Sequence, residues 1–174
     1  AKEHTAGPES ASVVSAPPPP VGATGPDKQV RFSITKVQER ARAGEKLVML
    51  TCYDASFARL SYDAGVDMLL IGDSLGMVIQ GRDSTLAVTV EETEYHVRCV
   101  VRGSARALVI ADMPFGSFQE SPAQAFHNCA RMMAAGAQMV KLEGGAAMVE
   151  TTRFLVDRGI PVCAPIGLTP PSVH

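Results

Sequence analysis

The sequence predicts an α/β protein with a parallel β-sheet, and two patterns carry this prediction. From residue 46 onward, short aliphatic or β-branched runs alternate with amphipathic stretches of helical periodicity. Each of the four helical stretches between these runs ends at a glycine, and the next run begins within a few residues (Gly65, Gly103, Gly136, Gly159). Strand–helix–strand repetition with short connections is typical of right-handed βαβ units, which form parallel sheets. We therefore expect five strands joined by four crossover helices.

The first half of the pattern contains two strands. A helix over residues 33–42 precedes the first strand and is expected to cover one end of the sheet. The first strand spans 46–52, and Asp54 is placed to cap the helix that follows it. The apolar face of that helix is predicted to contain Phe57, Leu60, Ser61 and Ala64. The second strand, 67–71, lacks polar alternation, which indicates burial on both faces.

Three further strands alternate with helices in the second half. One helix begins at Thr89 or Glu91, and Ser121 followed by Pro122 is typical of the N-cap and first position of the next, which should end at Gly136. The expected buried positions are Val90, Val97, Val100 and Val101 on the first helix and Phe126, Cys129, Ala130 and Met133 on the second. The remaining expected elements are strands 107–111, 138–142 and 160–164 and a helix over 147–158.

The sequence divides into two segments of different composition. Residues 1–30 are rich in Pro, Ala, Gly and Ser, contain no aromatic residue and hold six of the twelve prolines. Such a segment cannot bury enough apolar surface to offset its ordering entropy, so we expect a disordered arm. The remaining 144 residues of the 174 suit one domain, spanning 31–174. They are fewer than the roughly 250 residues of a complete (β/α)8 barrel.

Composition excludes several functional classes. A net charge of −2 gives no basic surface for nucleic acid, and we expect no nucleic-acid partner. The sequence has no apolar run of about 18 residues, so we expect no membrane span, and residues 1–30 lack the apolar core of a secretory signal. Widely spaced cysteines argue against a disulfide framework or a zinc site and favour a reduced, cytoplasmic setting (Cys52, Cys99, Cys129, Cys163).

Polar residues follow three neighbouring strands at the point where each strand ends. Asp73 and Ser74 follow the second strand, Asp112 follows the third, and Lys141 and Glu143 stand at the end of the fourth. The three acids come seven to nine residues after a helix-ending glycine, so they recur in register. Functional groups of parallel α/β sheets gather at the carboxyl ends of strands. The sequence therefore predicts a site at this rim.

The residue types at this rim allow two interpretations. Carboxylates without a neighbouring histidine or cysteine suit a hard cation, Mg²⁺ or Mn²⁺, whose remaining ligand positions a 2-oxo acid can fill with its keto and carboxylate oxygens. Such a cation acts as a Lewis acid that stabilises an enolate, and Lys141 could neutralise the substrate carboxylate or the developing oxyanion. Alternatively, Asp73 and Asp112 simply cap the helices that follow them. The spacing alone leaves both interpretations open.

Short motifs near the strand ends identify a family. They are Thr51-Cys52-Tyr53-Asp54, Gly72-Asp73-Ser74-Leu75-Gly76-Met77, Gln80-Gly81, Thr89-Val90, Ala111-Asp112-Met113-Pro114-Phe115, Val140-Lys141-Leu142-Glu143-Gly144-Gly145 and Gly167-Leu168-Thr169-Pro170. In this order and strand context, from about residue 33 to residue 174, they closely resemble the ketopantoate hydroxymethyltransferase family. The resemblance implies a (β/α)8 TIM barrel of the phosphoenolpyruvate/pyruvate superfamily, here truncated to about five strands.

The resemblance also implies a reaction and its participants. The family transfers a hydroxymethyl group from methylene-tetrahydrofolate to 3-methyl-2-oxobutanoate (α-ketoisovalerate), which gives ketopantoate in pantothenate biosynthesis. It implies Mg²⁺ as cofactor, a cytoplasmic enzyme and a homo-oligomer, typically a decamer. Matched to this sequence, Asp73 and Asp112 resemble the metal ligands, with Glu143 a third carboxylate of the metal site. Asp73, Ser74, Asp112 and Lys141 resemble the residues that bind the oxo acid.

The sequence departs from the family pattern near its end. Pro165 and Pro171 stand where the family has a histidine, on the substrate side, and a glutamine. The family's general base is a glutamate expected beyond His174, and abstraction of the C3 proton needs a base within hydrogen-bond reach. Because the acids of the rim are committed to metal or substrate, we expect little or no activity from this 174-residue polypeptide alone.

Two alternatives to this function remain. One is an isocitrate lyase-like C–C lyase, which also holds a 2-oxo acid on Mg²⁺ but typically needs a reactive cysteine loop that no cysteine here provides. The other is an inactive, truncated barrel that acts only by assembly with complete barrels.

Overall fold

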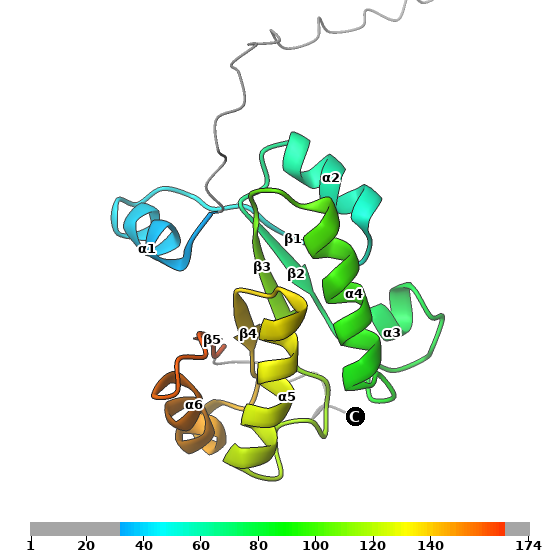
Figure 1. Ribbon diagram of the computed structural model, residues 1–174, viewed down its shortest axis with the longest axis vertical. Helices are drawn as coiled ribbons and strands as arrows, with labels where there is room; N and C mark the ends of the chain where they lie inside the picture. The colour runs from blue at the N-terminus through cyan, green and yellow to red at the C-terminus, as the bar shows by residue number, and fades with distance from the viewer. Residues whose placement is uncertain (1–31, 166–174) are drawn as a thin grey trace, which may run out of the picture.

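The computed structural model describes residues 32–165 (Figure 1). The predicted disordered arm, 1–30, and Pro171 lie outside the described residues. The five predicted strands form one parallel sheet in the order β1-β2-β3-β4-β5, which confirms the fold class. The strands are β1 (Met49–Thr51), β2 (Met68–Ile71), β3 (Leu108–Asp112), β4 (Met139–Lys141) and β5 (Val162–Cys163). Their ends differ from the predicted ones by at most three residues.

The strand order places the chain among barrel-like folds. Each crossover moves one strand further in the same direction, whereas a doubly wound sheet reverses direction at its switch point. The four predicted crossover helices pack in the same succession, α2 on α4, α4 on α5 and α5 on α6 (Figure 1). They are α2 (Ala55–Asp63), α4 (Val90–Gly103), α5 (Pro122–Ala135) and α6 (Val149–Val156). This arrangement is five consecutive strands of a (β/α) barrel with their helices.

Three short segments complete the described fold. The helix predicted over 33–42 is present as α1 (Ile34–Arg42), with Ser33 as its N-cap, but none of its side chains is buried. Arg40 pairs with Asp67, so α1 lies at the amino end of the sheet through polar contacts. The four-residue helix α3 (Leu75–Val78) was not predicted, and the helix predicted over 147–158 is divided into a 3-10 turn, η1 (Gly145–Met148), and α6.

Capping side chains set the start of the two longest helices. Thr89 and Glu92 form a complete capping box at the start of α4, in which each side chain accepts a hydrogen bond from the other's backbone N–H. Ser121 accepts a hydrogen bond from Gln124 at the start of α5, and Gly136 ends that helix with a φ of 109°, as predicted. The positions of α4 and α5 on the sheet therefore follow from local sequence signals.

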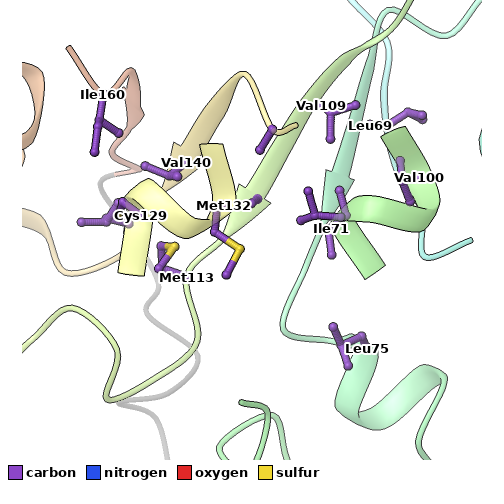
Figure 2. Close-up of a cluster of buried hydrophobic side chains, with 14 of the residues drawn as sticks. Leu69, Ile71, Leu75, Val100, Val109, Met113, Cys129, Met132, Val140 and Ile160 are labelled. Carbon is purple, nitrogen blue, oxygen red and sulfur yellow. The ribbon is translucent and has the colours of Figure 1, made fainter. Parts of the chain in front are cut away.

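The hydrophobic core lies between the centre of the sheet and the helices α4 and α5 (Figure 2). All five residues of β3 are buried, and Leu69, Val109 and Val140 of β2, β3 and β4 have no exposed surface. Val100 of α4 and Met132 of α5 are also fully buried, opposite the strands. A core of this kind fixes the ends of β2, β3 and β4 relative to one another.

The prediction for α2 was wrong in its buried face. Phe57 and Leu60, expected against the sheet, are 64% and 63% exposed, and Ala58 is the buried residue of this helix. The helix approaches α4 so closely that a Cβ at Gly103 would lie 2.2 Å from the carbonyl oxygen of Ala55. Small residues at this junction set the rotation of α2, a constraint that hydrophobic periodicity does not contain. Within residues 32–165, no helix is long and apolar enough to cross a membrane.

Candidate active site at the carboxyl ends of the strands

The structure brings the three predicted carboxylates to one cavity. Asp73, Asp112 and Glu143 line a hollow of about 250 Å³ at the carboxyl ends of β2, β3 and β4. The rest of its wall is mainly apolar and comes from the segments after β3 and β4, with Met113, Phe115, Phe118, Ala147 and Met148 among the lining residues. The cavity thus combines a carboxylate rim with an apolar flank, as small-molecule sites commonly do.

Strand register places Lys141 beside Asp112. The two residues are partners in the pairing of β3 with β4, so their side chains leave neighbouring strands at the same level. The ammonium group of Lys141 donates hydrogen bonds to Asp112 Oδ2 at 2.6 Å and to Glu143 Oε1 at 2.7 Å. All three side chains are at most about one-fifth exposed. A single cation therefore bridges two of the three carboxylates.

Burial gives Asp112 unusual acid–base properties. The pKa of Asp112 is raised from 3.8 to about 7, chiefly by desolvation, with the negative charges of Asp73 and Glu143 adding to the rise and Lys141 opposing it. Burial lowers the pKa of Lys141, but its hydrogen bonds and attraction to Asp112 and Glu143 outweigh that effect and leave it raised. Lys141 therefore stays positively charged. Because the pKa of Asp112 is raised, an added positive charge in the cavity would favour its ionised form.

The capping interpretation of Asp73 and Asp112 does not hold. No side-chain hydrogen bond caps α3, and Ser121 rather than Asp112 caps α5. Neither carboxylate is therefore used by the first turn of the helix that follows it. Carboxylates that do not cap a helix and that line a cavity are available to a ligand.

The donor set fits a hard divalent cation. Lys141 occupies one oxygen of Asp112, which leaves Oδ1 without a hydrogen bond from the described residues. Within residues 32–165, no three His, Cys, Asp or Glu side chains form a ready-made metal cage. Mg²⁺ does not need one, because it usually takes one or two carboxylates and fills its other positions with water and substrate oxygens. Asp73 and Asp112 are the residues of this rim that could hold it, with Glu143 nearby.

Ser74 has a partner that the sequence analysis missed. Its hydroxyl lies 2.6 Å from the phenolic oxygen of Tyr53, which follows β1. Tyr53 lies at a strand end, in the first of the motifs that resemble the family, and this position could have indicated a role at the rim. The apolar flank of the cavity was also missed, because Phe118 lies in an irregular segment and Met148 in the short 3-10 turn η1, and neither segment has a periodicity that predicts a cavity wall. Pro165 lies just after β5 and is half-buried, and it is not among the residues that line the cavity.

Solved structures define the class to which this fold belongs. The chain matches 2,3-dimethylmalate lyase, a PEP mutase/isocitrate lyase superfamily member, with a TM-score of 0.57 and 15% identity, covering 75% of this chain and 51% of that chain. It also matches phosphonopyruvate hydrolase in complex with oxalate and Mg²⁺, with a TM-score of 0.53 and 13% identity over 64% of this chain and 38% of that chain. These likenesses show that the chain shares the fold of these proteins.

Sequence relatives narrow this class to one family. The chain is 70% identical over 131 residues to the 3-methyl-2-oxobutanoate hydroxymethyltransferase of Azoarcus sp. (strain BH72), covering 75% of this chain and 48% of that protein. It is 64% identical over 149 residues to the enzyme of that name from Aromatoleum aromaticum, covering 85% and 54%. The profile of the ketopantoate hydroxymethyltransferase family matches residues 31–174, so the chain belongs to this family. It spans about half the length of the curated relatives it matches.

Proposed function

We propose that this cavity binds 3-methyl-2-oxobutanoate together with Mg²⁺, for hydroxymethyl transfer from methylene-tetrahydrofolate to give ketopantoate in pantothenate biosynthesis. The observation that carries the proposal is the buried carboxylate of Asp112, bridged by Lys141 and sharing one cavity with Asp73 and Glu143. The high identity to hydroxymethyltransferases supports the choice of substrate. The free cysteines support a reducing, cytoplasmic location.

The residues of the rim divide the work of holding the oxo acid. Lys141 keeps a positive charge between Asp112 and Glu143 and offers it to the carboxylate or keto oxygen of the substrate. Ser74 supplies a hydroxyl donor at the same strand ends. The branched alkyl group of the oxo acid fits the apolar flank, where Met113, Phe118 and Met148 line the cavity.

Asp73 and Asp112 would hold the divalent cation, with Glu143 as the third carboxylate of the site. The chemistry that Mg²⁺ supplies when bound is Lewis-acid polarisation of the keto group, which makes the C3 proton easier to remove. The raised pKa of Asp112, about 7, predicts that metal binding releases a proton near neutral pH.

Proton removal at C3 needs a base in addition to these groups. All three acids that line the cavity are assigned to the metal or contacted by Lys141. We propose that the 174-residue polypeptide by itself binds the oxo acid but exchanges its C3 proton slowly.

Titration and exchange together test this function. In buffer with Mg²⁺, the polypeptide should bind 3-methyl-2-oxobutanoate at least tenfold more tightly than glyoxylate or succinate, the ligands of an isocitrate lyase-like enzyme. Lys141→Met should weaken this binding by at least tenfold, because it removes the positive charge held between Asp112 and Glu143. Tighter binding of glyoxylate would overturn the substrate assignment.

Deuterium exchange at C3, followed by NMR in D₂O, tests the missing base. Exchange close to the rate in buffer alone is expected, and rapid Mg²⁺-dependent exchange would contradict this part of the proposal. Full-length relatives of the family provide the positive control.

A further inference from the structure

Tyr53 and Ser74 form a hydroxyl pair at the carboxyl ends of β1 and β2. Tyr53 comes two residues after β1 and Ser74 three residues after β2, and these parallel strands are neighbours in the sheet. Both side chains therefore emerge at the carboxyl rim, where the phenolic and serine oxygens are 2.6 Å apart. Asp73, directly before Ser74, lines the cavity.

The hydroxyl of Ser74 does not cap the helix that follows it. Ser74 occupies the N-cap position of α3, where a serine normally accepts a hydrogen bond from the backbone of the first turn. No such bond forms here, and the hydroxyl is held by Tyr53 instead. The backbone of Ser74 is already helical (φ −54°, ψ −14°), so its side chain does not cap α3 and contacts Tyr53 instead.

Two further features hold the pair in place. The carbonyl oxygen of Tyr53 accepts a hydrogen bond of 2.7 Å from Nδ1 of His96 on α4, and the two rings meet edge to face with centroids 6.3 Å apart. A Cβ at Gly72 would lie 2.9 Å from the side-chain oxygen of Ser74, so a larger residue here would force the hydroxyl to shift. The arrangement depends on three separate segments of the chain.

The direction of the hydrogen bonds follows from the chemistry of the ligand. A 2-oxo acid at neutral pH offers only acceptor oxygens, so Ser74 must donate its proton to the ligand. Its oxygen is then the acceptor for the phenolic proton of Tyr53. A chain of two hydroxyls pointing the same way polarises each member and strengthens the last bond.

We propose that Tyr53 is a positioning residue that aims the hydroxyl proton of Ser74 at the bound 2-oxo acid. The inference rests on the proposed function, because it needs Ser74 to contact that ligand. It assigns Tyr53 no contact with the reacting atoms or with the metal carboxylates.

A double-mutant cycle tests the proposal in the full chain. Titration of 3-methyl-2-oxobutanoate in the presence of Mg²⁺ should show binding about fivefold to tenfold weaker in Tyr53→Phe, which removes only the phenolic oxygen. Ser74→Ala should weaken binding by about tenfold or more. The double variant should bind like Ser74→Ala alone, because Tyr53 acts only through Ser74. Multiplicative losses in the double variant would contradict the proposal.

Tyr95→Phe is the matched control. Tyr95 is 65% exposed and its ring meets the same His96 edge to face, at 5.3 Å. This variant should bind the oxo acid like the wild type. Mg²⁺ alone should bind equally to the wild type and to Tyr53→Phe, whereas general damage to the rim would weaken both ligands.

The outcomes separate the inference from the proposed function. A wild-type chain that does not bind the oxo acid overturns both. A wild-type chain that binds it, with equal affinity in Tyr53→Phe, overturns the inference alone. If Tyr53→Phe does not fold, Gly72→Ala takes its place: it keeps Tyr53 but displaces the hydroxyl of Ser74, and it should weaken oxo-acid binding to a similar extent.

Discussion

The centre of the sheet and its first strand differ sharply in how they are packed. Leu69 of β2 and Leu50 of β1 are register partners on neighbouring strands, yet Leu69 is completely buried and Leu50 is 48% exposed. Every residue of β3 is buried, whereas every residue of β1 is exposed. The rim residues Asp73, Asp112 and Lys141 all extend from β2, β3 and β4. The candidate site is therefore built on the part of the sheet that is held most firmly.

Substitution of Leu69 and Leu50 should give the largest difference in stability between the two regions. Leu69→Ala should lower the free energy of unfolding by about 2–5 kcal/mol, because it leaves a cavity in a close-packed core. Leu50→Ala should cost less than about 1 kcal/mol, because its side chain is already half in solvent. Urea unfolding followed by circular dichroism measures both. Equal losses would show that β1 is as well packed as the centre.

The pH dependence of stability measures the energetic cost of burying the Asp112 carboxylate at the centre of the sheet. The pKa of Asp112 is raised in the folded protein to about 7 from an ordinary 3.8, so the folded state binds this proton more tightly than the unfolded state. Its contribution to stability is full below about pH 4 and is lost as the pH rises through 7. Between pH 4 and pH 8, the stability of Asp112→Asn should therefore rise relative to that of the wild type by about 4 kcal/mol.

Denaturant titrations at pH 4, 6 and 8 measure this difference. Asp63→Asn on α2, which is exposed and paired with Arg59, is the control from the edge of the molecule and should follow the wild-type profile. A wild-type profile for Asp112→Asn would mean that burial does not disturb this carboxyl.

Substitution at the contact between α4 and α2 should have a smaller effect on the free energy of unfolding. At Gly103, where α4 meets the start of α2, an added Cβ would overlap the backbone of Ala55 at 2.2 Å. Gly103→Ala should cost about 2–3 kcal/mol, because a backbone atom cannot move aside like a side chain. Gly44→Ala, at a φ of 74° with nothing within 4 Å, should cost about 1 kcal/mol through backbone strain alone. Thermal unfolding compares the two, and a smaller loss in Gly103→Ala would show that α2 is loosely attached.

Much of the centre could be predicted from the sequence, because its signals are local. Capping residues, glycine stops and aliphatic runs gave the strands, the crossover helices and the carboxylates at the rim. The edge was predicted less well. Phe57 and Leu60 have helical spacing, but the backbone contact at Gly103 decides which face of α2 is buried. Periodicity alone cannot detect such a contact.

The site was predicted as a set of residues but not as a set of contacts. Strand-end spacing placed Asp73, Asp112 and Glu143 at one rim, and the structure shows that they share one cavity. The contact of Tyr53 with Ser74 depends on two adjacent strands ending at the same level, which is a property of the sheet. The bridging position of Lys141 between two carboxylates also requires the register of β3 with β4.

The most direct test is whether Mg²⁺ and the oxo acid bind to this rim together. Calorimetric titration with 3-methyl-2-oxobutanoate should show binding at least tenfold tighter in the presence of Mg²⁺ than in its absence. By linkage, the oxo acid should tighten Mg²⁺ binding by the same factor. Both effects should disappear in Asp112→Asn. Oxo-acid binding that is indifferent to Mg²⁺, or unchanged coupling in Asp112→Asn, would contradict the assignment of this rim as the metal and substrate site.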